Sequence, residues 1–205
     1  LGTLWNSFRF FAQYANIDAY EPDQEAPPPE ARRRADRWIL SRLQSLAGET
    51  AAAMDAYDLV RAVRLLRTFL EDELSNWYIR RSRKRFWGAE KAEESADKGA
   101  AYATLAQVMR TLAALFAPIM PFSADVLWRQ VRRRDDPPSV HLAPFPQPDP
   151  VLIDRELEEA MACVLRLVAL GRQVRAEHNL KVRQPLRRML VGAPPAARAH
   201  LTDPG

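Results

Sequence analysis

The most constraining feature of the sequence is a long stretch without helix-breaking residues. Between Gly48 and Gly88 the chain contains neither glycine nor proline. These two residue types interrupt helices most often, so residues 49–87 can form long helices. Apolar side chains recur there every three or four positions, at Leu59, Val63, Leu66, Leu70, Leu74 and Trp77. We therefore expect a long amphipathic helix that starts after Asp58 as its N-cap and buries this stripe.

Helical periodicity also dominates the rest of the chain. We expect further helices at about 1–20, 34–57, 98–116, 124–133 and 154–177, with Ser123 as the cap of the fourth of these. The proline-rich segments 21–30 and 134–150 are typical of loops, and the segment 186–191 allows a strand after Pro185.

These elements predict an all-α protein with two parts. Residues 1–150 form a helical bundle that includes the proline-rich loop 134–150. Residues 151–205 supply a long helix and a junction region, a small tail in which a mixed α/β domain could start.

Composition narrows the function classes. The chain has 205 residues, of which 47% are hydrophobic and 27% charged, which is typical of a folded globular protein. Its one cysteine, Cys163, cannot form an internal disulfide, so we expect the reducing environment of the cytoplasm. We also expect the protein to be a monomer. The three histidines are too far apart for a zinc site, and the seven glycines are scattered, so no phosphate-binding loop is present. No apolar run approaches the roughly 18 residues of a membrane span. Because the chain starts at Leu1, we expect it to be a piece of a longer protein.

A basic and aromatic run is the strongest functional signal. Five of the six positions from Arg80 to Arg85 are cationic, and aromatic residues flank them at Trp77, Tyr78, Phe86 and Trp87. Cations neutralise phosphates and flat rings stack on unpaired bases, so this combination suits single-stranded or looped RNA. On a helix, Trp77, Arg80, Arg81 and Lys84 share one side.

Two simpler interpretations of this run stay open. Trp77 extends the apolar stripe, so it can be a core residue. The arginines can form a solvated basic face at the C-terminal end of a helix, where cations favour the helix dipole.

Several stretches resemble the anticodon-binding region of class I isoleucyl-tRNA synthetases, in the type that also occurs in eukaryotes. They are residues 4–11 with 14–18, 36–43, 74–87, 115–122, 139–142 and 180–186. The run 74–87 is the most specific of them, whereas 115–122 (Leu-Phe-Ala-Pro-Ile-Met-Pro-Phe) is shared with valyl, leucyl and methionyl relatives. The resemblance covers nearly the whole chain.

This resemblance implies a helical bundle that grips the anticodon stem-loop of isoleucine tRNA, together with the remainder of the synthetase chain. The full-length parent would be an isoleucine–tRNA ligase that uses ATP and Mg²⁺, with zinc outside this region. The class I signatures His-x-Gly-His and Lys-Met-Ser-Lys-Ser are not in this sequence. We therefore expect no catalytic residue, metal or cofactor here.

The resemblance also implies a set of RNA-binding residues. A tryptophan that stacks on an anticodon base in methionyl relatives falls at Trp77, so we expect Trp77 and Arg80 nearest the bases. We expect Arg81, Arg83, Lys84 and Arg85 on phosphates. The first helix adds Arg9 and Tyr14, and the tail adds Lys181 and Arg183.

Other functions are compatible with the same residues. The bundle could come from a valyl- or leucyl-tRNA synthetase, although the run 75–87 argues against this. It could be a helical protein-interaction module whose aromatic side chains form a groove for a partner. It could also be a non-specific basic helix for any nucleic acid or an acidic membrane surface.

Overall fold

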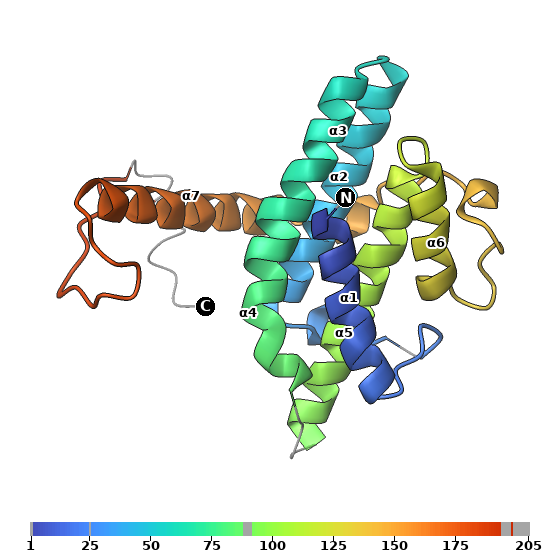
Figure 1. Ribbon diagram of the computed structural model, residues 1–205, viewed down its shortest axis with the longest axis horizontal. Helices are drawn as coiled ribbons and strands as arrows, with labels where there is room; N and C mark the ends of the chain where they lie inside the picture. The colour runs from blue at the N-terminus through green and yellow to red at the C-terminus, as the bar shows by residue number, and fades with distance from the viewer. Residues whose placement is uncertain (1, 25, 88–91, 194–197, 199–205) are drawn as a thin grey trace. The chain divides into compact units, whose positions relative to one another are not determined.

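The chain divides into two compact units. The computed structural model describes residues 2–24, 26–87, 92–193 and 198. The first unit spans Leu1–Ile153 and the second Asp154–Gly205. Every regular element among the described residues is helical, which confirms the all-α fold class (Figure 1).

A helical hairpin forms one arm of the first unit. Helices α2 (Arg34–Asp55) and α3 (Leu59–Thr68) lie side by side and pack on each other (Figure 1). Tyr57 makes the turn between them with a left-handed φ of 56°. The predicted cap is confirmed, since the Asp58 side chain accepts a hydrogen bond of 2.9 Å from the backbone N–H of Arg61.

From α3 the chain continues as one rod to Phe86, but the rod changes its pitch. It passes through the π-helical segment η2 (Phe69–Ile79), the short α4 (Arg80–Ser82) and the 3-10 turn η3 (Arg83–Phe86). The i→i+5 hydrogen bonds of a π-helix widen each turn. Buried side chains accordingly recur every four residues, at Leu66, Leu70, Leu74, Tyr78, Ser82 and Phe86.

The apolar stripe predicted with a period of 3.6 is therefore wrong at both ends. Leu59 and Val63 are 56% and 42% exposed. At the other end, the wider turn brings Tyr78 rather than Trp77 under Leu74. Tyr78 is 1% exposed, whereas Trp77 is only partly buried.

Helix α5 is the centre of the first unit. It spans Ala92–Phe116 and so begins earlier than the predicted residue 98. It packs against α2, against α1 (Gly2–Ile17) and against α6 (Pro121–Val131). Its fully buried side chains include Leu105, Val108, Met109, Leu112 and Leu115. A helix covered on several sides is expected to be apolar around most of its circumference, as this one is.

The N-terminus of α6 differs from the prediction. The helix begins at Pro121, and its N-cap Met120 makes no side-chain capping bond, so the cap predicted at Ser123 is wrong. Proline suits the first helical position because its fixed φ matches the helix and its missing N–H would have no partner there.

The proline-rich loop includes the single turns η4 (Val140–Leu142) and η5 (Pro150–Leu152). Val140 is buried, and the backbone N–H of Asp149 donates to Gln44 Oε1 at 2.9 Å. These two contacts anchor the loop to the first unit.

The second unit consists mainly of α7 (Arg155–Glu177). Asp154 caps it by accepting a hydrogen bond of 2.9 Å from the N–H of Leu157. The strand that residues 186–191 allow is not formed, and this segment has no regular secondary structure. It lies against α7 instead, where the Met189 sulfur is 3.6 Å from the place of a Cβ on Gly171.

Candidate nucleic-acid interface

The basic run, Arg80 to Arg85, occupies the end of the rod, over α4 and η3. Arg80, Arg81, Arg83 and Lys84 are all exposed. Four cationic side chains within five positions make this end of the rod a surface that favours anions. The structure therefore places four of the five predicted cations where a phosphate could reach them.

Trp77 lies at the edge of this surface. The guanidinium carbon of Arg81 is 4.9 Å from its ring centroid, a cation–π contact. Trp77 is only partly buried, so it is not a core residue, and the base contact predicted for it stays a prediction.

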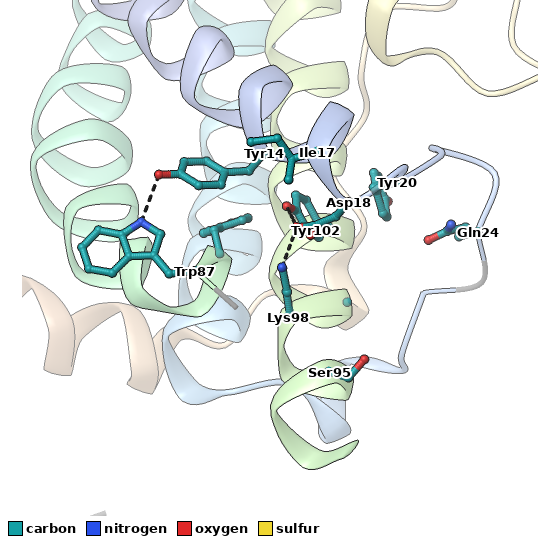
Figure 2. A pocket seen from close by; sticks show the side chains of 11 residues that line it. Tyr14, Ile17, Asp18, Tyr20, Gln24, Trp87, Ser95, Lys98 and Tyr102 are labelled. Atoms are coloured by element: carbon teal, nitrogen blue, oxygen red, sulfur yellow. Dashed lines mark hydrogen bonds and ion pairs between the residues drawn. The ribbon is translucent and has the colours of Figure 1, made fainter. Parts of the chain in front are cut away.

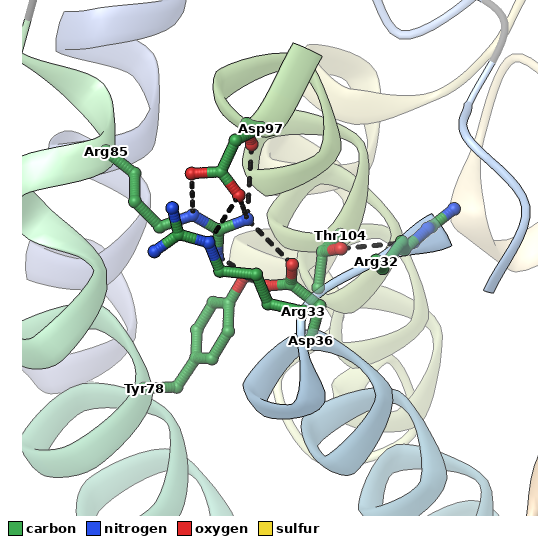
Figure 3. Close-up of polar contacts among 7 residues, drawn as sticks. All are labelled: Arg32, Arg33, Asp36, Tyr78, Arg85, Asp97 and Thr104. Carbon is green, nitrogen blue, oxygen red and sulfur yellow. Dashed lines mark hydrogen bonds and ion pairs between the residues drawn. The ribbon is translucent and has the colours of Figure 1, made fainter. Parts of the chain in front are cut away.

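Arg85, for which a phosphate contact is predicted, is buried and paired with carboxylates in this structure. Its side chain is only 6% exposed. Its guanidinium forms a bidentate ion pair with the carboxylate of Asp36, with both N–O distances at 2.7 Å. On its other edge, Nε and Nη2 donate to the carboxylate of Asp97 at 3.0 and 2.8 Å (Figure 3). Burial by itself would lower the pKa of Arg85, but the hydrogen bonds to Asp36 raise it above its usual value. The run thus contains one arginine that is structural.

Other polar groups complete the buried cluster. Tyr78 donates its hydroxyl to Asp36 at 2.6 Å, and burial together with the Asp36 charge raises the pKa of Tyr78 well above its usual value. Arg33 reaches Asp97 at 2.7 Å from the solvent side. The cluster therefore joins α2 and its preceding residue, the rod and α5 (Figure 3).

An aromatic cavity of about 590 Å³ opens beside the end of the run. It is lined by Tyr14, Ile17, Asp18, Tyr20, Gln24, Phe86, Trp87, Ser95, Lys98, Gly99 and Tyr102. Trp87 is 54% exposed, and its indole N–H donates to the Tyr14 hydroxyl at 3.0 Å (Figure 2). An exposed indole at the mouth of an aromatic cavity is well suited to stack on a flat ligand.

Sequence reasoning named Trp87 as part of the run but not as a binding residue. The sequence feature that could have indicated a binding role is its position directly before Gly88, outside the apolar stripe that the helix buries. The cavity itself could not be found this way, because Tyr14 and Trp87 are 73 positions apart.

A charged pair forms part of the cavity wall. Lys98 Nζ lies 2.6 Å from Asp18 Oδ2, and the Tyr102 hydroxyl donates to the same oxygen. Burial alone would raise the pKa of Asp18, but these two hydrogen bonds lower it below its usual value. Asp18 is thus an ionised acceptor inside an aromatic site.

The remaining predicted residues lie in different places. Arg9 is exposed on α1, and Arg83 holds its guanidinium carbon 5.8 Å from the Phe10 ring centroid. Lys181 and Arg183 are exposed in the second unit, in a loop whose Lys181 carbonyl accepts a hydrogen bond of 2.9 Å from Arg175.

Among the described residues no group of three or more His, Cys, Asp and Glu side chains could hold a metal ion. No helix in that part of the chain is long and apolar enough to cross a bilayer.

Comparison with known families decides the classification. A family model for the anticodon-binding domain of tRNA ligase matches residues 36–190. This chain belongs to that family. The matched range of the anticodon-binding domain runs from Asp36 of the buried cluster, through the basic run, into the second unit.

The anticodon-binding domain is also similar to curated isoleucine–tRNA ligases. It is 46% identical to the isoleucine–tRNA ligase of Thermus thermophilus over 198 residues. These residues cover 95% of this chain and 18% of the length of the relative. It is 49% identical to that of Thermobifida fusca over 195 residues, or 94% of this chain and 18% of the relative. For that of Cytophaga hutchinsonii the identity is 44% over 203 residues, again 18% of the relative. The chain thus spans less than a fifth of the length of these proteins.

Proposed function

We propose that this chain is the part of an isoleucine–tRNA ligase that binds the anticodon stem-loop of isoleucine tRNA. The family assignment supports a role at the anticodon, and the names of its relatives support isoleucine. The single observation that carries the proposal at the level of residues is the exposed Trp87 at an aromatic cavity, next to four exposed cations.

In this proposal the two kinds of side chain have separate tasks. Arg80, Arg81, Arg83 and Lys84 neutralise phosphates, which positions the RNA without reading its sequence. Trp87 stacks on an unpaired base that enters the cavity, where Asp18 can accept a hydrogen bond from an N–H of the base edge. Arg9 of the first unit, and Lys181 and Arg183 of the second, add further contacts to the RNA backbone. Trp77, whose ring is in contact with the Arg81 guanidinium, lies beside the anticodon loop in this proposal.

The remainder of the ligase would bind ATP with Mg²⁺ and isoleucine and join the amino acid to tRNA. This chain would supply tRNA selection and orientation and would be non-catalytic. We further propose that the ligase is a cytoplasmic monomer.

The test is equilibrium binding of the chain to the isoleucine-tRNA anticodon stem-loop. The same hairpin with a changed anticodon, and a DNA duplex, serve as competitors at two salt concentrations. We expect a preference for the native anticodon that persists at the higher salt concentration. Equal, salt-sensitive binding of all three would instead indicate a non-specific basic helix. Absence of RNA binding would favour a protein-interaction module.

A matched pair of tryptophan variants locates the stacking ring. Trp87→Ala should weaken binding by about 1–3 kcal/mol, or roughly 5- to 150-fold, if its ring stacks on a base. Trp77→Ala serves as the matched comparison, because the Arg81 guanidinium already lies over one face of its ring. A larger loss of affinity in Trp77→Ala than in Trp87→Ala would return the base contact to Trp77.

A further inference from the structure

We propose that Arg85 is a positioning residue for the RNA site, and that it acts through a clasp formed by Asp36, Arg85 and Asp97. This inference rests on the proposed function, because it assigns the clasp to the cavity that takes the unpaired base. It replaces the phosphate contact expected from the sequence with a different task for the same arginine.

The hydrogen bonds of the Arg85 guanidinium leave few of its N–H groups for a ligand. Nη1 and Nη2 bind the two oxygens of Asp36, each at 2.7 Å. Nε and Nη2 bind the two oxygens of Asp97, and Nη2 also lies 3.1 Å from the Asp97 carbonyl. A guanidinium has five N–H groups, and these contacts leave one of them, on Nη1.

The position of the clasp in the chain connects it to the cavity. Arg85 directly precedes Phe86 and Trp87, and Asp97 directly precedes Lys98 and Gly99. All four following residues line the cavity. The clasp therefore holds the two walls that η3 and α5 contribute at a fixed separation. Rigid Arg–carboxylate pairs are suited to this because the planar fork fixes orientation as well as distance.

Aromatic packing passes this constraint on to the cavity. The Phe86 ring meets the Tyr102 ring edge-on with centroids 4.9 Å apart, and it meets Phe10 at 5.2 Å. Trp87 is tied to Tyr14 of α1. A shift of η3 against α5 would therefore move the indole away from the opening in which a base would lie.

Charge gives a second distinction between positioning and phosphate binding. The carboxylates of Asp36 and Asp97 neutralise the single positive charge of Arg85, and that of Asp36 is fully buried. A cation compensated in this way releases no counterion from RNA. Changing it should leave the dependence of log Kd on log salt unaltered, whereas losing a true phosphate contact lowers that slope by about 1.

The experiment is a double-mutant cycle between Arg85→Lys and Trp87→Ala, read as Kd for the anticodon stem-loop over a salt series. Lysine keeps the charge but loses the fork. We expect Arg85→Lys to weaken binding within the roughly 5- to 150-fold range of a stacked base. In the Trp87→Ala background it should have little further effect, since the ring it positions is gone. Arg85→Gln, which removes the charge, should leave the salt slope unchanged. Arg83→Ala is the control that should lower the slope.

Several results would overturn the inference. They are unchanged affinity in Arg85→Lys, a slope reduced by about 1 in Arg85→Gln, or effects of Arg85→Lys and Trp87→Ala that simply add. Stem-loop binding that is absent in the unmodified chain would refute the proposed function as well, and is distinguished by appearing before any substitution. If Arg85→Lys does not fold, as judged by circular dichroism, Asp97→Asn replaces it in the same cycle, because Arg85 then keeps Asp36 and loses the α5 side of the clasp. This variant is read by affinity alone, since it also removes the ion pair of Asp97 with Arg33.

Discussion

Replacing Asp36 by asparagine tests the buried cluster most directly. The Asp36 side chain is 0% exposed and accepts three short hydrogen bonds, from Tyr78 at 2.6 Å and twice from Arg85 at 2.7 Å. Asn keeps the shape, removes the charge and turns one acceptor into a donor that faces other donors. Removing one partner of a buried ion pair costs about 3–5 kcal/mol because the other charge stays buried. Asp97 still compensates Arg85, so we expect the lower end, about 3 kcal/mol.

This loss is large compared with the total free energy of unfolding of a domain, about 5–15 kcal/mol. For a unit of this size it should lower the Tm by roughly 6–12 °C. Tryptophan fluorescence is the appropriate readout, since all five tryptophans lie within residues 1–153 and report on the first unit.

The control for Asp36→Asn is the same substitution at the surface. Asp23 pairs with Arg134, whose side chain is 81% exposed, so Asp23→Asn should change stability by less than about 1 kcal/mol. If Asp36→Asn is no more destabilising than Asp23→Asn, the cluster does not contribute as a buried pair and the reasoning about the clasp fails with it.

Three further predictions concern other parts of the chain. The lowered pKa of Asp18 stabilises the fold above the unfolded-state value of about 4, and this stabilisation is lost as the pH falls through the folded-state pKa. Thermal melts should therefore show Asp18→Asn below the unmodified chain at pH 7 and level with it in strong acid. Gly48→Ala should raise the free energy of unfolding in urea by up to about 1 kcal/mol, because the new Cβ would meet only the Pro148 ring, 3.4 Å from its Cγ and 3.8 Å from its Cβ; a loss would mean that this contact is too tight. Asp154→Ala should cost about 1 kcal/mol through the lost cap of α7, seen as reduced helix content on heating by circular dichroism, and an unchanged melt would argue against the cap.

Local features of this fold could be predicted from the sequence. The cap Asp58 and the start of α2 depend on neighbouring residues, so a few adjacent positions predict them, whereas the cap predicted at Ser123 was wrong. The phase of the rod could not be found in this way, because a period of 3.6 was assumed where η2 has wider turns. The spacing of four from Leu66 to Phe86 was present in the sequence as the alternative signal.

The interface was less predictable than the helices. Exposed cations were placed correctly in the run, but Arg85 looks like its neighbours until its partners are known. One of these, Asp36, is 49 positions away, and the sequence offers many carboxylates at comparable separations. The cavity depends on contacts of the same long range between α1, η3 and α5. Pairings of this kind follow from the packing of the bundle and carry no local signature.

The π-helical segment η2 makes the length of the chain between α3 and Trp87 as important as its composition. Each residue of an α-helix advances the chain by about 100° around the axis and 1.5 Å along it. If the segment keeps its wide turns, loss of one residue from 69–79 would rotate everything after it by roughly a quarter turn, since about four residues complete one turn there. Arg85 would turn away from Asp36, and the indole of Trp87 would leave the cavity. Insertions and deletions in η2 should therefore be far less tolerated than substitutions at its exposed positions.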